Sequence, residues 1–234
     1  MPDRPSPEKP TTVLPGTLYI VATPIGNLAD ITFRAVEVLR SVDLVLAEDT
    51  RNSATLLKQY RITTPMRSYH AHSRGRKEAQ ILEELAQGQA MAVITDAGTP
   101  TVSDPGNRLV ELARRAGHPV VPVPGPSAVT AALSATGLGG DAFTFLGFLP
   151  HKKGRQTKLD ALGKMTPPVV LYESPHRLVK LLGELANRYP AAQVTVAREL
   201  TKRFEEFAVG TPDELTARYT QTPPRGEIVV VVRV

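Results

Sequence analysis

The sequence predicts an α/β protein with two domains, the first with a mainly parallel sheet and the second with a mixed sheet. Short apolar runs alternate with helix-like segments from residue 17 to residue 123, a pattern typical of a parallel sheet covered by helices. Two later runs, at 194–197 and 204–209, have no helix between them, which predicts an antiparallel hairpin. A chain of 234 residues is long enough for two domains of about 110 residues each.

The elements of the first domain follow from apolar spacing and from the residues that end helices. Phe33, Val36 and Leu39 share one face of the helix expected at 32–41. Gly88 and Gly117 follow two further helices and suit the left-handed turn that ends a helix. The strands are expected at 17–22, 44–47, 66–69, 91–95 and 119–123, and the remaining helices at 52–60, 77–87 and 107–116.

The second domain is predicted to begin at Gly125, so that the two domains span residues 17–124 and 125–234. Its last run, 228–232, is almost entirely valine, which predicts a central strand that is buried on both faces. Residues 1–16 are rich in proline and poor in apolar residues, so we expect disorder there. The strands are expected at 143–145, 169–172, 194–197, 204–209 and 228–232, and the helices near 126, at 176–188 and at 212–219, with a linker at 137–140.

Composition excludes several classes of protein. The chain has no cysteine, which rules out disulfides and thiolate metal sites and fits the cytoplasm. No apolar run is long enough to span a bilayer, and the N-terminus lacks an apolar signal core. His70 and His72 alternate, but no third ligand lies nearby, so we expect no metal. The formal net charge of +5 favours an anionic partner, although many enzymes that bind no nucleic acid are equally basic.

Two loops follow expected strands and are candidates for a ligand site. The loop at 96–100 follows the run 91–95, and the loop at 124–128 follows the run 120–123. Ligands of open α/β sheets bind beyond the carboxyl ends of the strands. Gly98 and Gly125 would let the backbone approach a ligand closely. Each loop alone fits an ordinary strand-to-helix turn, but the pair predicts a ligand cleft.

Nine short motifs, spread between Gly16 and the C-terminus, resemble the sequence pattern of a known family. They are ATPIGNL at 22–28, AEDTR at 47–51, TDAGTP at 95–100, SDPG at 103–106, PGPSA at 124–128, GFLP at 147–150, YESPHR at 172–177, ARELTK at 197–202 and GE at 226–227. In this order they resemble the tetrapyrrole-methylase fold family of S-adenosylmethionine-dependent methyltransferases. Within that family, the chain is most similar to bacterial enzymes that methylate a cytidine 2′-hydroxyl in small-subunit (16S) ribosomal RNA.

The resemblance implies two α/β domains with the methyl donor, S-adenosylmethionine, in a cleft between them, and a homodimer. Backbone groups of Gly98, Thr99 and Ser127 would then contact the donor. Asp96 would accept a hydrogen bond from a donor hydroxyl or amine, unless it only caps a helix or turn. The full set of donor-binding candidates is Asp96, Ala97, Gly98, Thr99, Pro100, Ser103, Pro124, Gly125, Ser127, Ala128 and Tyr172.

Transfer to a ribose hydroxyl needs a group that removes its proton. A carboxylate or histidine within hydrogen-bond reach can act as this general base. Four residues in or beside the family motifs are candidates, namely Glu48, Asp49, His72 and Glu199. The alternative is structural, with Glu48 and Asp49 paired to Arg51, and Glu199 paired to Arg198 or Lys202.

An RNA substrate needs an electropositive surface, and segments 70–77 and 151–158 are basic. The candidates for contact with ribosomal RNA are Arg74, Arg76, Lys77, Lys152, Lys153, Arg155 and Lys158, although a solvated charge run is the usual reading of one such segment. Many members of the family also carry a C-terminal extension, whose RNA contacts would be absent or replaced in a chain ending at Val234. Two other functions stay open, a tetrapyrrole (precorrin-type) carbon methyltransferase and a non-catalytic RNA- or nucleotide-binding module.

Overall fold

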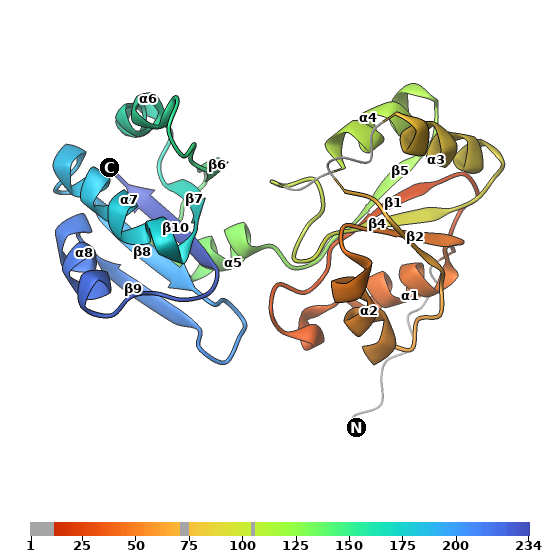
Figure 1. Ribbon diagram of the computed structural model, residues 1–234, viewed down its shortest axis with the longest axis horizontal. Coiled ribbons are helices and arrows are strands. Elements are labelled where there is room, and N and C mark those ends of the chain that lie inside the picture. The colour runs from red at the N-terminus through yellow and green to blue at the C-terminus, as the bar shows by residue number, and fades with distance from the viewer. Residues whose placement is uncertain (1–11, 71–74, 104–105) are drawn as a thin grey trace. The chain divides into compact units, whose positions relative to one another are not determined.

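The computed structural model describes residues 12–70, 75–103 and 106–234, which form two compact units (Figure 1). The chain divides after Pro126, so that Met1–Pro126 contains the first unit and Ser127–Val234 forms the second. Of the segment 1–16, where we expect disorder, residues 1–11 lie outside the described residues, as do the candidates His72 and Arg74. Within 12–16, the Leu14 N–H donates to the Tyr19 hydroxyl and the Gly16 N–H donates to the Gly88 carbonyl. None of the helices in the described ranges is long and apolar enough to cross a membrane.

The first unit contains a five-stranded sheet in the order β3-β2-β4-β1-β5, and all of its strand pairs are parallel. This arrangement confirms the predicted parallel sheet. It also places the carboxyl ends of β1, β2 and β4 at one edge. The strands are β1 (Leu18–Val21), β2 (Leu44–Ala47), β3 (Met66–Ser68), β4 (Met91–Ile94) and β5 (Val120–Val123).

Helices cover both faces of this sheet (Figure 1). On one face, Leu39 of α1 and Leu56 of α2 pack against strand residues, and on the other Ile81 of α3 and Leu109 of α4 do the same. Residues of β1, β2 and β4 are therefore buried on both sides, which explains their uninterrupted apolar runs. The helices are α1 (Phe33–Ser41), α2 (Thr50–Gln59), α3 (Arg76–Ala86) and α4 (Asn107–Arg115), with a 3₁₀ turn at Leu28–Asp30.

The second unit contains a mixed five-stranded sheet in the order β6-β7-β10-β8-β9. The β6–β7 pair is parallel, and the pairs β7–β10, β10–β8 and β8–β9 are antiparallel, which confirms the predicted hairpin. The valine-rich strand β10 is central, as its composition predicts. The strands are β6 (Thr144–Phe148), β7 (Val169–Glu173), β8 (Gln193–Arg198), β9 (Glu206–Gly210) and β10 (Ile228–Arg233).

One helix of the second unit lacks a clear apolar signal in the sequence. α6 has only six residues, and Leu159 is its one apolar side chain, so spacing alone predicts a loop or a helix start there. Leu159 joins the core formed by α7, α8 and one face of the sheet, whereas α5 contacts β10. The helices are α5 (Ala128–Thr136), α6 (Arg155–Asp160), α7 (Pro175–Arg188) and α8 (Pro212–Gln221), with a 3₁₀ turn at Leu162–Lys164.

Candidate functional site at the carboxyl edge of the first sheet

The loop after β4 is fastened to the end of β1 by two backbone hydrogen bonds. The Thr23 N–H donates to the Gly98 carbonyl at 2.9 Å, and the Gly98 N–H donates to the Thr23 carbonyl at 3.0 Å. The Thr23 hydroxyl also donates to the Thr95 carbonyl at 3.0 Å. The Gly98 N–H therefore already has a partner within the fold, and the predicted contact between backbone groups of Gly98 and the donor stays a prediction. Glycine is required here because φ is +84° and a Cβ would lie 3.3 Å from Ile25.

The loop after β5 contacts the same edge of the first unit. A Cβ on Gly125 would lie 2.9 Å from the Ala22 Cβ, so this glycine permits close packing against the end of β1. The Thr99 hydroxyl donates to the Pro126 carbonyl at 3.1 Å and so joins the two predicted loops. Ser127 stands at the N-cap of α5, but its side chain makes no capping hydrogen bond.

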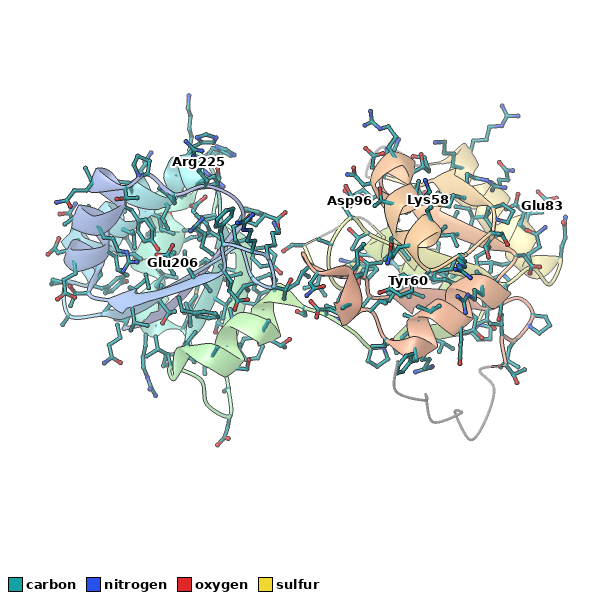
Figure 2. All side chains as sticks on the ribbon, turned by 90° about the horizontal axis from the view of Figure 1, so that it is seen from below. Lys58, Tyr60, Glu83, Asp96, Glu206 and Arg225 are labelled. Atoms are coloured by element: carbon teal, nitrogen blue, oxygen red, sulfur yellow. The ribbon has the colours of Figure 1, made fainter. Side chains whose placement is uncertain are left out.

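Three of the predicted acidic residues come together beyond β2 and β4. Asp96, labelled in Figure 2, accepts hydrogen bonds from the Asp49 N–H at 3.3 Å and from the Asn52 side-chain amide at 2.9 Å. Glu48 accepts a hydrogen bond from the Thr95 hydroxyl at 2.8 Å. Sequence reasoning did not single out Asn52 or Thr95, although Thr95 opens the motif at 95–100 and Asn52 directly follows the motif at 47–51.

A small hollow lies beside this acidic group. Its volume is about 150 Å³, and its lining includes Ser53. The Ser53 hydroxyl is buried and has no hydrogen-bond partner among the described residues. Small-molecule sites usually measure about 300–1,000 Å³, so this hollow suits one polar part of a larger ligand. The lining residues are Thr23, Pro24, Leu28, Asn52, Ser53, Thr55, Leu56, Thr95 and Asp96.

Asp49 is engaged in an ion pair that weakens it as a base. Its side chain caps α2 by accepting from the Arg51 N–H at 2.9 Å, and it accepts from the Arg51 guanidinium at 2.7 Å. The hydrogen bond from the Arg51 side chain lowers the pKa of Asp49 to about 2. A carboxylate this acidic has little tendency to take a proton near neutral pH.

Glu199, in the second unit, is held in a similar way. Its carboxylate accepts from Lys202 Nζ at 2.8 Å and from the Glu227 N–H at 3.0 Å. The hydrogen bond from Lys202 lowers the pKa of Glu199. A Cβ on Gly226 would lie 2.1 Å from the Glu199 carboxylate, so the glycine of the GE motif makes room for this pair. Three of the predicted bases lie in the described ranges, namely Glu48, Asp49 and Glu199. Asp49 and Glu199 each form an ion pair there, and Glu48 forms none with the described residues.

The basic candidates divide into exposed and buried side chains. Lys152, Lys153 and Lys158 are exposed and form no ion pair with the described part of the chain, and Arg76 and Lys77 are exposed on α3. Arg155 differs, because it is only 2% exposed.

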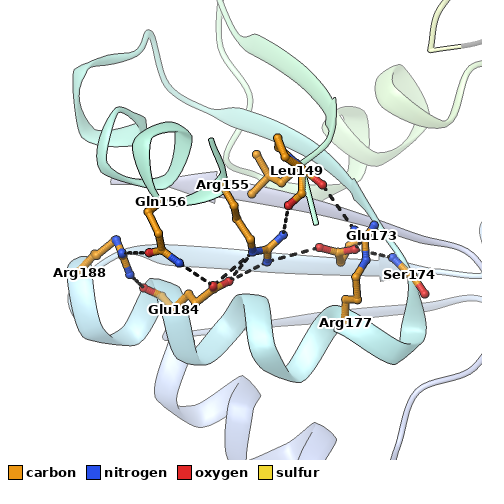
Figure 3. Close-up of polar contacts among 9 residues, drawn as sticks. Leu149, Arg155, Gln156, Glu173, Ser174, Arg177, Glu184 and Arg188 are labelled. Carbon is orange, nitrogen blue, oxygen red and sulfur yellow. Dashed lines mark hydrogen bonds and ion pairs between the residues drawn. The ribbon is translucent and has the colours of Figure 1, made fainter. Parts of the chain in front are cut away.

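The guanidinium of Arg155 contacts Glu184 at 2.6 Å and lies 3.8 Å from Glu173 (Figure 3). The prediction that Arg155 contacts RNA is therefore wrong. Its role is to hold α6 against α7, and no sequence pattern predicts this pairing because Glu184 lies far along the chain.

The remaining candidates are placed as follows. Ala97 and Ser103 are exposed, and Pro100 is buried. Tyr172 lies on β7, where its ring contacts two phenylalanines. Within the described ranges, no group of three histidine, aspartate or glutamate residues is arranged to hold a metal.

Comparison with known proteins supports these assignments of fold and family. The family model for Tetrapyrrole (Corrin/Porphyrin) Methylases matches residues 17–216. "Ribosomal RNA small subunit methyltransferase I" of Synechocystis sp. is 47% identical over 93% of this chain and 78% of that protein. The protein of the same name from Mesorhizobium japonicum is 49% identical over 96% of this chain and 78% of that protein.

A solved structure shows the same fold at lower sequence identity. Uroporphyrin-III C-methyltransferase from Thermus thermophilus, complexed with S-adenosylhomocysteine, superposes with a TM-score of 0.63 and 17% identity. The match covers 92% of this chain and 96% of that chain. The chain thus belongs to the Tetrapyrrole (Corrin/Porphyrin) Methylases, a family of methyltransferases, and within it to the group of ribosomal RNA small subunit methyltransferases I.

Proposed function

We propose that this protein transfers a methyl group from S-adenosylmethionine to the ribose 2′-hydroxyl of a cytidine in small-subunit ribosomal RNA. The observation that carries the proposal is the 47–49% identity to ribosomal RNA small subunit methyltransferases I over at least 93% of the chain. The resemblance in the sequence motifs supplies the cytidine ribose as the target. We also propose that the protein acts in the cytoplasm, which a ribosomal RNA substrate supports. We expect a homodimer, which light scattering across a dilution series tests.

The carboxyl edge of the first sheet fits the methyl donor. S-adenosylmethionine carries a sulfonium and an ammonium group, and the Asp96 carboxylate, which accepts a hydrogen bond from Asn52, lies at this edge. Ser53 lines the hollow beside Asp96, and its buried hydroxyl lacks a hydrogen-bond partner among the described residues. We assign Asn52, Ser53 and Asp96 to donor binding, with the loops at 96–100 and 124–128 as the surrounding framework. The bound donor supplies an electrophilic methyl carbon.

Glu48 is the described carboxylate best suited to act as the general base. It forms no ion pair within the described ranges, whereas Asp49 and Glu199 are neutralised by Arg51 and Lys202. Its hydrogen bond from Thr95 fixes one carboxylate oxygen at the end of β2. The remaining task of the protein is alignment of the hydroxyl with the methyl carbon, which supplies up to about 10 kcal/mol in favourable cases.

The test measures transfer of a labelled methyl group to deproteinised small-subunit ribosomal RNA, followed by mapping of ribose methylation. Transfer to the base, or methylation of RNA with 2′-deoxycytidine at the mapped position, would contradict the proposal. Uroporphyrinogen III serves as the competing acceptor, because its methylation would favour the tetrapyrrole alternative. A protein that binds RNA but transfers no methyl group to either acceptor would favour a non-catalytic binding module.

A matched pair of variants tests the assignment of the base. Glu48→Gln should lower kcat by about 10²- to 10⁴-fold while donor affinity stays within about threefold, since general bases contribute on this scale. Asp49→Asn keeps an N-cap oxygen and should lower kcat much less. A larger loss of kcat in Asp49→Asn than in Glu48→Gln would assign the proton transfer to Asp49.

A further inference from the structure

A bulge in β6 gathers three aromatic rings at one end of the second sheet. Phe145 pairs with Val170 and Phe148 pairs with Tyr172, but the register shifts between Phe145 and Gly147. In a regular strand, side chains three positions apart point to opposite faces. The extra residue of the bulge turns Phe148 to the same side as Phe145, and both rings contact Tyr172, with centroids 5.1 and 5.5 Å away. Bulges often re-aim a side chain in this way beside functional sites.

Phe148 completes this cluster but remains open to solvent. The residue is 55% exposed, although its ring lies against Tyr172. The guanidinium of Arg177 lies 6.0 Å from the centroid of the Phe148 ring. Arg177 is itself fixed, because it contacts Glu173 at 2.7 Å and donates to the Leu149 carbonyl. The exposed ring therefore has a rigid backing of one aromatic and one cationic group.

The segment that follows Phe148 is held by buried ionic contacts (Figure 3). Arg155 donates to the Pro150 carbonyl at 3.3 Å and to Glu184, and Arg177 donates to the Leu149 carbonyl. These contacts fix both ends of the short connection between β6 and α6. This connection presents the exposed side chains of Lys152 and Lys153 close after the aromatic ring in the chain.

We propose that Phe148 is a stacking platform for an unpaired nucleobase of the RNA substrate, with Lys152 and Lys153 neutralising the adjoining phosphates. This inference rests on the proposed function and adds a substrate subsite to it. Sequence-tolerant binding of single strands combines a positive surface with aromatic rings on which bases stack, and the described residues supply both. Arg177 supports the platform, because its cation–π contact with the ring helps to hold the ring in place.

Charge selects RNA over a second copy of the chain as the occupant. A two-fold interface centred on Phe148 would bring this patch against itself. Lys152, Lys153 and Lys158 would then oppose their own counterparts, and none of them has an acidic partner among the described residues. An RNA strand instead brings a phosphate to these lysines and a base to the ring.

The test uses the absence of tryptophan from the sequence. Phe148→Trp creates a single fluorophore at the platform, and stacking of a base on the indole should quench its emission when deproteinised small-subunit ribosomal RNA is added. Phe204→Trp is the matched control, because Phe204 is 63% exposed and has Arg203 5.5 Å from its ring, but it pairs with no aromatic ring in the part of the chain that the structure describes. A fully double-stranded RNA of equal length should quench neither variant strongly, because its bases are paired.

Affinity measurements complete the test. Phe148→Ala should weaken binding of deproteinised small-subunit ribosomal RNA by roughly 5- to 150-fold, which is the range for loss of one stacked base. Phe148→Tyr keeps an aromatic ring and should retain most of the affinity. Affinity for S-adenosylmethionine should stay unchanged in both variants. Equal losses of RNA affinity in Phe148→Ala and Phe204→Ala would overturn the assignment. Unchanged RNA affinity in Phe148→Ala would overturn it as well.

A change in oligomeric state with unchanged RNA affinity would assign the patch to a second copy and also overturn the inference. RNA binding is measured whether or not methyl transfer occurs, so failure of the proposed reaction is distinguishable from failure of this subsite. If the wild-type protein transfers the methyl group normally but Phe148→Ala does not change KM for RNA, the proposed function holds. The proposed stacking role of Phe148 is then wrong.

Discussion

Replacing Arg155 by methionine should strongly destabilise the second unit. The Arg155 side chain is 3% exposed, and its guanidinium contacts Glu184 through two nitrogens at 2.6 and 2.9 Å. Methionine fills much of the same space but carries no charge and donates no hydrogen bond. The variant therefore leaves Glu184 without its main partner in a site where its side chain is 13% exposed.

The expected loss of stability follows from what remains after the change. Removal of one partner from a buried ion pair costs about 3–5 kcal/mol. Glu173 keeps its contact with Arg177 at 2.7 Å, and Glu184 keeps a weak hydrogen bond from Gln156 at 3.3 Å. We therefore expect a loss near the lower end, about 3 kcal/mol, which corresponds to a fall of roughly 12 °C or more in the Tm of a unit this size.

Urea unfolding followed by circular dichroism measures the effect, with the transition of the second unit fitted separately from that of the first. Lys152→Met is the control, because Lys152 lies exposed just before the same helix and should change stability by no more than about 0.5 kcal/mol. The double variant Arg155→Met with Glu184→Leu should be more stable than Arg155→Met alone, since no carboxylate is then left unpaired. A loss of less than about 1 kcal/mol in the free energy of unfolding of Arg155→Met would refute the reasoning. Strictly additive effects of Arg155→Met and Glu184→Leu in the double variant would refute it as well.

Three further predictions address the charges of the second unit. Because Lys202 lowers the pKa of Glu199 below its usual 4.5, this pair stabilises the fold above that pH and loses its effect as pH falls below it. The free energies of unfolding of wild type and Glu199→Gln should accordingly converge as pH falls below 4.5. A difference between them that stays constant with pH would argue against a stabilising pair. Gly226→Ala should cost more than about 1 kcal/mol in thermal unfolding, because φ is +83° and the new Cβ overlaps the Glu199 carboxylate. Replacing Lys152 and Lys153 by alanine should reduce the slope of log K for RNA against log salt by about 1.4, and an unchanged slope would place the phosphates elsewhere.

The fold was predictable because its apolar signals are simple. Strands buried on both faces give uninterrupted apolar runs, and β10 shows this most clearly with four consecutive valines. α6 was predicted only as a loop or a helix start, because it lacks such an apolar signal. It is held largely by the ion pair of Arg155 with Glu184, and a pairing between distant charged residues leaves no periodic pattern.

The site was predictable only in part. The order of the strands places Glu48 and Asp96 at one edge, which the alternation of strands and helices anticipates. Hydrogen-bond partners are not visible in the same way. The bond between the Gly98 N–H and Thr23, and the neutralisation of Asp49 by Arg51, depend on local geometry that spacing does not encode.

The link between Thr23 and Gly98 has a consequence for how the protein responds to its ligand. These residues are 75 positions apart, and the loop takes its shape only when β1 and β4 have already paired with their neighbours. An unfolded chain therefore lacks the donor site that we propose, so donor binding at that site should draw the equilibrium toward the folded state. At a free donor concentration one hundred times Kd, binding there should stabilise the first unit by about 2.7 kcal/mol, which should raise its Tm and slow its proteolysis.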